Sequence, residues 1–267
     1  MLRVAVSGIA GRMGSRIGQI LSETSGVVLA GGFERPGHPL VGKDLSFAVG
    51  GEPRGVIIGS SIEEVLSAAE VVIDFTSAEA SLANLRAASR AGVPMVIGST
   101  GWKPEGLAEA RELAGRVPVV IAPNMSRGVN VLFKVVADVA RLLGEDFDIE
   151  VLEAHHRMKK DAPSGTALRL AEAAAKALGR DLSAVGVYER RGLTGERTKD
   201  EIGLQTLRGG DIVGEHMVLF AGMGERIELI HRAHSRDNFA RGAVHAAKWV
   251  VAQPPGLYDM QDVLGIK

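Results

Sequence analysis

The 267-residue sequence contains no cysteine. This absence excludes disulfides, thiolate zinc sites, cysteine-ligated iron–sulfur clusters and thiol nucleophiles, and it fits a reducing compartment. Aromatic residues make up only 4%, and 31 basic residues face 32 acidic ones, so neither stacking platforms nor a basic excess indicates nucleic-acid binding. The N-terminus lacks the long apolar run of a signal peptide, and no run reaches the ~18 residues of a membrane span. We therefore expect a cytoplasmic protein that binds neither nucleic acid nor membrane.

Short apolar runs and helical patterns alternate through the first half of the chain. The runs are rich in Val, Ile and Ala with little polar alternation, which is typical of parallel strands buried on both faces. This order predicts an α/β fold with a Rossmann-like, doubly wound parallel sheet. The expected strands are Leu2–Ser7, Val27–Phe33, Val71–Phe75, Val93–Ile97 and Val117–Ala122, and the expected helices are Met13–Ser22, Ile62–Ala68, Ala78–Ala91 and Glu105–Ala114.

The pattern changes after about Ser126, which predicts a second, α+β domain with a mixed open sheet. Its strands mix apolar and polar residues, as a sheet with one solvated or partner-facing side does. Expected here are a helix over Val129–Leu143, a strand in "DFDIEVLEA", a helix over Thr166–Leu178, strands over Gly186–Arg191, Gly203–Arg208, Ile212–Ala221 and Arg226–Ala233, and a last helix over Phe239–Val251.

The stretch "VAVSGIAGRMGSR" places Gly8, Gly11 and Gly14 between the first strand and the first helix. Glycines there allow a tight turn and a close approach of a pyrophosphate to the helix N-terminus. The alternative is that they mark only an ordinary strand-to-helix turn without a ligand. Glu34 directly follows the second strand, at the position where dinucleotide folds bind the adenosine ribose, and Arg35 beside it suits a 2'-phosphate. An exposed charged pair is the alternative for these two. Together the features favour an NAD(P) site.

Small and polar residues also follow the fourth and fifth strands. Gly98, Ser99 and Thr100 end one, and Ala122-Pro123-Asn124-Met125 ends the other. Ligands bind at the carboxyl ends of parallel strands, although such residues are common in any loop. Their recurrence at equivalent positions favours a ligand site.

The stretch "EAHHRMKKDAPSGTA" brings His155, His156 and two lysines to a strand end, just before a helix start near Gly165 with Ser164 as its expected N-cap. Histidine suits proton transfer near neutral pH, and a helix start binds anions. The combination predicts a site for an anionic substrate. A solvated basic loop is one alternative. A zinc site, to which His231 and His234 could contribute, is a poorer one because the ligand spacings are wrong.

These residues resemble the signature E-[AL]-H-H-x-x-K-x-D-A-P-S-G-T-A of the 4-hydroxy-tetrahydrodipicolinate (dihydrodipicolinate) reductase family. Blocks such as "GIAGRMG", "VIDFTS", "VIGSTGW", "APNMSRGVNVL" and "HSRDNFARGAVHAAKW" resemble the family in the same order, so the resemblance spans nearly the whole chain. It implies reduction of 4-hydroxy-tetrahydrodipicolinate to tetrahydrodipicolinate, with loss of water, in diaminopimelate and L-lysine biosynthesis. The reductant would be NADH, NADPH or both.

The resemblance also implies roles for single residues. His155 would be the proton donor and Lys159 a donor or cation, while His156 would contact substrate and Gly165 with Thr166 would hold a carboxylate. No metal is implied. The cofactor would contact Gly8, Ile9, Ala10, Gly11, Arg12 and Met13, then Glu34 and Arg35, and on the nicotinamide side Gly98, Ser99, Thr100, Ala122, Pro123, Asn124 and Met125.

The implied architecture has three parts. Residues 1–126 would form the dinucleotide-binding domain, with the C-terminal segment 237–267 packing back onto it. Residues 127–236 would bind the dicarboxylate substrate and pair with other subunits in a homotetramer. From the residues alone, two rivals remain: a two-domain dehydrogenase for a sugar or amino acid, and a regulatory protein that binds NAD(P)H without chemistry.

Overall fold

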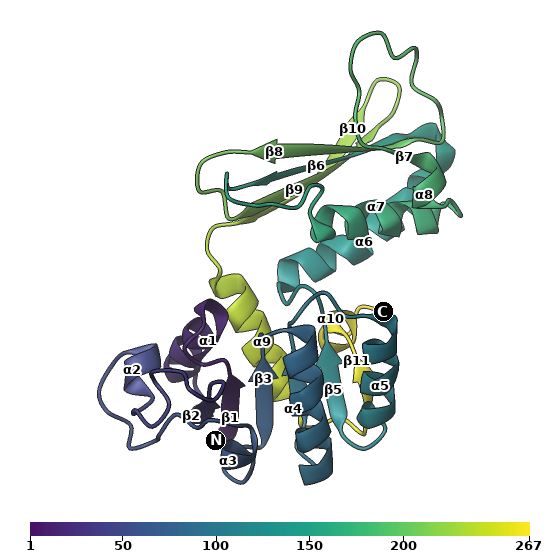
Figure 1. The fold of residues 1–267 in the computed structure, drawn as a ribbon. Coiled ribbons are helices and arrows are strands. Elements are labelled where there is room, and N and C mark those ends of the chain that lie inside the picture. Colours follow the sequence, from purple (N-terminus) through teal and green to yellow (C-terminus); the bar gives the residue numbers. More distant parts are fainter. The chain divides into compact units, whose positions relative to one another are not determined.

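The computed structural model describes residues 1–267 and divides them into two compact units (Figure 1). The first unit comprises Met1–Arg127 and Asp237–Gly265, and the second comprises Gly128–Arg236 with Ile266–Lys267. No helix combines the length and apolar character needed to cross a bilayer.

The first unit is built on a six-stranded sheet in which every neighbouring pair is parallel. The order is β11-β5-β4-β3-β1-β2, so the chain reverses direction across the sheet between β1 and β3. The strands are β1 (Leu2–Ser7), β2 (Val27–Phe33), β3 (Val71–Asp74), β4 (Met95–Ile97), β5 (Pro118–Ile121) and β11 (Gly256–Tyr258). The helices are α1 (Arg12–Glu23), α2 (Ser46–Val49), α3 (Glu63–Leu66), α4 (Ala78–Ala91), α5 (Pro104–Ala114), α9 (Asp237–Val250) and α10 (Met260–Leu264).

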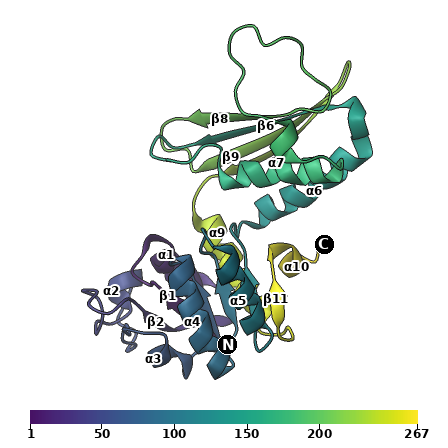
Figure 2. The same cartoon turned by 45° about the vertical axis from the view of Figure 1, so that its right-hand side comes forward.

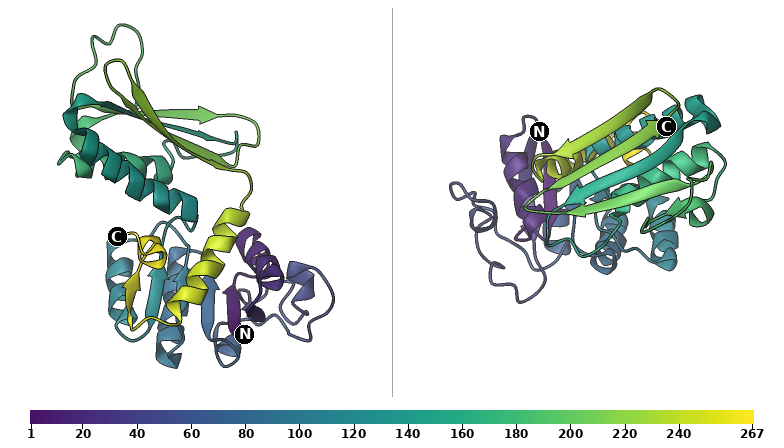
Figure 3. Two further views of the ribbon diagram at one scale, coloured as in Figure 1. Left: turned by 180° about the vertical axis from the view of Figure 1, so that it is seen from behind. Right: turned by 90° about the horizontal axis from the view of Figure 1, so that it is seen from above.

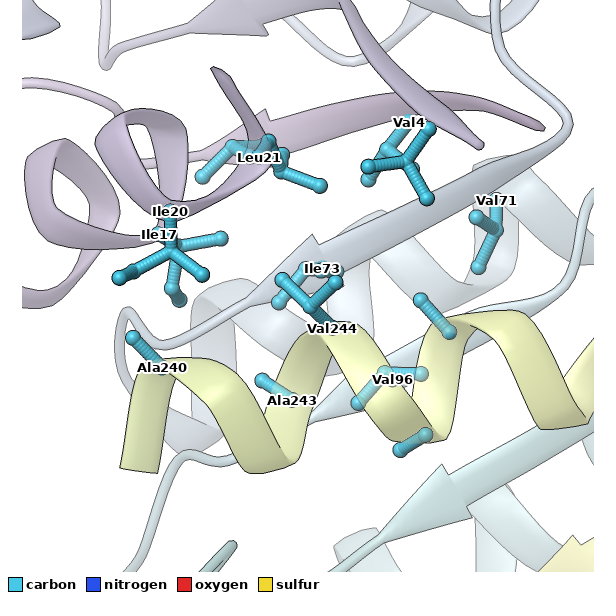
Figure 4. Close-up of a cluster of buried hydrophobic side chains, with 14 of the residues drawn as sticks. Val4, Ile17, Ile20, Leu21, Val71, Ile73, Val96, Ala240, Ala243 and Val244 are labelled. Carbon is cyan, nitrogen blue, oxygen red and sulfur yellow. The ribbon is translucent and has the colours of Figure 1, made fainter. Parts of the chain in front are cut away.

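Both faces of this sheet are covered, which explains the uninterrupted apolar strands. Val4 and Ile73 pack against α1 and α9 (Figure 4). Their neighbours Ala5 and Val72 pack on the other face against residues of α3, α4 and α5. Figure 2 shows α4 and α5 in front of the sheet. Successive strand residues point to opposite faces, so a strand with helices on both sides needs apolar residues at every position. The expected doubly wound sheet is confirmed.

The second unit contains a five-stranded mixed sheet of order β10-β9-β6-β8-β7. β6 pairs parallel with β8 and antiparallel with β9. The helices α6 and α7 cover one face, and no helix covers the other (Figure 3). The elements are α6 (Arg127–Leu143), a 3₁₀ turn (Gly144–Asp146), β6 (Asp148–His155), α7 (Gly165–Ala177), α8 (Leu182–Val185), β7 (Gly186–Val187), β8 (Ile202–Arg208), β9 (Gly214–Ala221) and β10 (Arg226–Ala233). The expected mixed sheet is confirmed.

Several elements differ from the expectation, and the short helices α2 and α8 were not expected. The strand expected over Gly186–Arg191 is only two residues long, because Arg190 and Arg197 in the following loop pair with acidic side chains of Glu150 and Glu201 instead of extending the ladder. The helix expected over Ile62–Ala68 shrinks to the four residues of α3. The strand β11 and helix α10 were not expected, since "QPPG" reads as a terminus rather than a connection.

Candidate active site

The glycine-rich turn after β1 offers backbone rather than side chains to a ligand. Gly8 adopts a left-handed conformation with φ +62°, which favours glycine. A Cβ on Gly14 would lie 2.0 Å from the carbonyl oxygen of Gly8, so only glycine allows this approach of helix and turn. Gly11 precedes α1 as N-cap without a side-chain cap, and the N–H groups of the first turn therefore face a ligand unobstructed by a capping side chain.

A cavity of about 580 Å³ lies at the carboxyl ends of β1, β2 and β3, the point where the sheet order reverses. Gly8, Glu34 and Arg35 line it. The carboxylate of Glu34 accepts a hydrogen bond of 2.9 Å from the N–H of Ala10, so the structure brings the predicted acid and the glycine turn together. Crevices at this reversal point bind dinucleotides in open α/β sheets, and the lining residues fit such a ligand.

The sequence interpretation overlooked one wall of this cavity. Thr76, Ser77 and Asn84 line it, as do Ser60 and Ser61. Buried Asp74 accepts hydrogen bonds from the Thr76 hydroxyl and the Asn84 amide and so fixes both side chains. Thr76 and Ser77 lie just after β3, with only Phe75 between the strand and Thr76, so the strand-end rule applied to β4 and β5 would have found them.

The remaining predicted cofactor residues occupy different environments. The ring of Phe75 would lie 2.3 Å from a Cβ on Gly98, so glycine is required there. Ser99 is buried and accepts or donates a hydrogen bond with Ser81, and the Asn124 side chain accepts one from the N–H of Ser126. Arg12, Thr100 and Pro123 are exposed. Met13 is partly buried, and Ala122 is buried. The side chains of Ile9 and Met125 are fully buried in the core, so only their backbone can meet a ligand.

In the second unit, β6 places Glu153 and His155 on its buried face. The two residues are separated by one position, so strand geometry points both side chains the same way. The carboxylate Oε2 of Glu153 lies 2.5 Å from the Nδ1 of His155. Desolvation by burial lowers the pKa of His155, and the carboxylate of Glu153 opposes this by stabilising the protonated ring.

Arg208 on β8 pairs with Glu153 through two hydrogen bonds of 2.8 Å. The Ser164 N–H donates a further bond of 3.0 Å to Glu153. Burial raises the pKa of Glu153, but the bonds from Arg208, His155 and Ser164 outweigh it and bring the pKa to about 2. Glu153 is therefore ionised at neutral pH and acts only as an acceptor.

His216 on β9 completes this cluster. Its ring contacts that of His155 edge-on with centroids 5.2 Å apart, and its Nε2 lies 3.2 Å from the Ser164 hydroxyl. Burial lowers the pKa of His216 to about 3, so the ring is neutral at physiological pH. Sequence reasoning overlooked Glu153, Arg208 and His216 as site residues.

The other predicted substrate residues lie in the loop after β6 and at the start of α7. Lys159 pairs with Asp161 at 2.9 Å, and the Lys159 N–H donates to the carbonyl of His156. Ser164 caps α7 by accepting from the Ala167 N–H, as expected. Gly165 has open space where a Cβ would stand, and Thr166 follows it in the first turn of α7. This leaves the helix start accessible to an anion.

The histidines do not converge on a metal site. His231 lies opposite His216 in the β9–β10 ladder. No group of three His, Asp or Glu side chains has an arrangement that could hold a metal ion.

Two family models match almost the entire chain. They are described as "Dihydrodipicolinate reductase, N-terminus", which matches residues 2–125, and "Dihydrodipicolinate reductase, C-terminus", which matches residues 128–264. The chain belongs to the dihydrodipicolinate reductase family. Its 4-hydroxy-tetrahydrodipicolinate reductase relatives include those of Syntrophobacter fumaroxidans, 67% identical, and Geotalea uraniireducens, 60% identical, each aligned over 100% of both chains.

Solved structures share the fold. Dipicolinate-bound dihydrodipicolinate reductase from Paenisporosarcina sp. TG-14 matches with a TM-score of 0.76 and 24% identity over 98% of both chains. An amine dehydrogenase from Mycobacterium smegmatis matches with a TM-score of 0.61 and 17% identity over 96% of this chain and 94% of that one.

The family membership confirms the expected activity, which is 4-hydroxy-tetrahydrodipicolinate reduction in lysine biosynthesis, and the expected reductant, which is NADH or NADPH. The rivals left open by the sequence, a sugar or amino-acid dehydrogenase and a non-catalytic nucleotide sensor, are thereby set aside. The roles of single residues in the reaction are inferred from the geometry of the site in each unit.

Proposed function

We propose that His155 is the proton donor of the reductase reaction and Lys159 the cation that stabilises the developing negative charge. The observation that carries this proposal is the buried Glu153–His155 pair, a histidine held at a strand end next to a capped helix start. A positioned histidine donates protons efficiently near neutral pH, and a fixed cation stabilises an anion best where water is excluded.

The substrate is a cyclic 2,6-dicarboxylate. Gly165 and Thr166 hold one carboxylate at the start of α7, and His156 contacts the substrate from the loop after β6. The dipicolinate bound to the Paenisporosarcina enzyme is a planar dicarboxylate of this kind. Open space at Gly165 and the uncrowded helix start support this assignment.

The chemistry follows from charge. Loss of the 4-hydroxyl as water leaves a double bond conjugated with the ring imine. NAD(P)H, when bound, would supply a hydride to that conjugated system. The reduced ring then carries an enamine-like negative charge. Lys159 stabilises this charge, and His155 protonates the carbon, which leaves a neutral imidazole that takes a new proton from solvent.

The cofactor residues are those that line the first unit's strand ends. The glycine turn from Gly8 to Met13 holds the pyrophosphate, Glu34 the adenosine ribose, and Arg35 a 2'-phosphate when NADPH is used. Residues 98–100 and 122–125 line the nicotinamide side. The cavity at β1, β2 and β3 and the Ala10–Glu34 bond support this placement.

The whole chain acts in the cytoplasm as a homotetramer. The second unit's sheet has a face that no helix covers, and Leu152, Met217 and Ile230 form a register row across it on β6, β9 and β10. An apolar row on an uncovered sheet face is typical of a subunit interface.

Turnover is the direct test of the reaction. The purified protein is given freshly prepared 4-hydroxy-tetrahydrodipicolinate with NADH or NADPH, and cofactor oxidation is followed by absorbance and the product by mass spectrometry. We expect one cofactor oxidised per tetrahydrodipicolinate formed. A folded protein that binds NADH but oxidises none in the presence of substrate would rule out the proposal.

A further inference from the structure

Glu153 is a buried carboxylate that the proton-donor mechanism leaves without a role. Only 2% of its surface is exposed, so it does not meet the substrate directly. It does bond to both predicted substrate-binding segments, however, through different oxygens: Oε2 contacts His155 Nδ1, and Oε1 accepts the Ser164 N–H. We propose that Glu153 is a positioning residue that fixes the proton donor and the carboxylate-binding helix start relative to each other. This inference rests on the proposed function of His155.

The bond to His155 decides which ring nitrogen can donate. Ionised Glu153 has no proton to give, so the Nδ1 of His155 must carry the hydrogen of this bond. The Nε2 is then the nitrogen that gains and loses the catalytic proton. Gly214 lies beside it, and a Cβ there would come within 3.1 Å of Nε2, so the absence of a side chain keeps that side of the ring accessible. After proton transfer the Nδ1–H bond remains and holds the neutral ring in place.

The bond to Ser164 connects the same carboxylate to α7. Ser164 is eleven positions further along the chain, and its hydroxyl caps the helix whose first residue is Gly165. Arg208 holds Glu153 in turn by two hydrogen bonds and also donates to the Asp161 carbonyl in the intervening loop. A rotation of the Glu153 side chain would therefore disturb the donor and the helix start together.

A simple structural ion pair between Glu153 and Arg208 is the competing explanation. It predicts a loss of stability on substitution, with an unchanged kcat in the variant that remains folded. The positioning role predicts a fall in kcat together with a change in the titration of His155, because the charged groups that face His155 are Glu153 on β6, Arg208 on β8 and Lys159 in the loop, with neutral His216 on β9. Glu153 is the only anion among them, and its loss leaves the protonated ring without its stabilising partner.

Glu153→Gln tests the charge while retaining an oxygen for Ser164. We expect kcat to fall about 10²- to 10⁴-fold, as when a histidine loses its orienting carboxylate. The alkaline limb of the kcat–pH profile, above which His155 is deprotonated, should move to lower pH, and an NMR titration of the His155 ring should show the same shift. The KM for NADH should stay unchanged, because the glycine turn is untouched.

Glu150→Gln is the matched control. Glu150 lies on the same strand and is also paired with an arginine through two bonds, but it faces Arg190 and not His155. The Glu150→Gln variant should lose a comparable amount of thermal stability, and the alkaline limb of its kcat–pH profile should stay at the wild-type pH. Glu153→Asp retains the charge and serves if Glu153→Gln is too unstable to assay; it should keep the wild-type limb with a reduced kcat.

The outcomes separate the inference from the function on which it rests. Wild-type kcat and an unmoved limb in Glu153→Gln, with His155→Gln strongly impaired, would overturn the positioning role and leave the proton donor standing. If Glu153→Gln is unassayable, an unreduced kcat in Glu153→Asp overturns it equally. Wild-type activity in His155→Gln would remove the proposed function itself.

Discussion

Lys159 and Lys160 are adjacent in the chain, but their surroundings differ. The Lys159 side chain is 20% exposed and pairs with Asp161, whereas Lys160 is exposed. If Lys159 is the fixed cation, Lys159→Met should reduce kcat by about two or more orders of magnitude, because the transition state loses its charge partner. Steady-state kinetics measures this, with Lys160→Met as the neighbouring control. Equal effects of the two substitutions would show that the loop contributes only general positive charge.

Gly14 shows how a single hydrogen atom in place of a methyl group shapes the cofactor site. Alanine there would place its Cβ 2.0 Å from the Gly8 carbonyl oxygen, and backbone cannot give way as a flexible side chain does. Gly14→Ala should therefore lower the free energy of unfolding by about 1–3 kcal/mol and weaken NADH binding, measured by fluorescence titration.

Gly106 supplies the control for that substitution. It is also helical, but a Cβ there would meet Trp102 at an ordinary 3.5 Å. Gly106→Ala should be neutral or slightly stabilising, since alanine has the higher helix propensity. If both variants bound NADH like the wild type, the close approach at the glycine turn would not matter for the cofactor.

At the scale of elements, His216 on β9 makes the free energy of unfolding depend on pH in the acidic range. The pKa of His216 is lowered from 6.5 to about 3 in the folded protein by burial. Between these values the unfolded chain binds a proton that the folded chain does not, so the free energy of unfolding falls as pH drops from about 6.5 toward 3. Denaturant unfolding of the protein across this range should show that slope. In His216→Gln the slope of the free energy of unfolding against pH should decrease by an amount that corresponds to at most one bound proton. An identical slope would mean that other groups cause the pH dependence.

The elements were predictable where apolar runs determine them. β1 and β2 were expected with their observed bounds, because a strand covered on both faces needs continuous apolar residues. The charged loop after β7 misled the strand prediction, since Arg190 resembles a polar strand position in sequence and pairs with Glu150 in the structure.

The proton-donor and carboxylate-binding residues were predictable because they are close in sequence, whereas the residues that hold them in place were not. The stretch from His155 to Thr166 is contiguous, so its chemistry could be recognised directly. Arg208 reaches Glu153 across 55 positions, and His216 reaches Ser164 across 52. These contacts depend on the pairing of β6 with β8 and β9, which no local pattern reveals.

At the scale of the whole molecule, the uncovered sheet face should mediate assembly. Sedimentation should give about four times the chain mass of 28.1 kDa. Ile230, which is 44% exposed in the isolated chain, should be buried in that assembly, so Ile230→Lys should yield smaller species. A wild-type protein that sediments as a monomer would contradict the homotetramer. Leu142→Lys is a surface control that should leave the mass unchanged, since Leu142 is 84% exposed on α6, which covers the opposite face of the sheet.

The most direct test of the central claim is the kcat of His155→Gln with 4-hydroxy-tetrahydrodipicolinate and saturating NADH or NADPH. Glutamine keeps a polar side chain next to Glu153 but offers no acidic proton, so kcat should fall by about 10²- to 10⁴-fold while the KM for NADH stays at its wild-type value. A folded variant with a kcat within a few-fold of the wild type would show that His155 does not donate the proton.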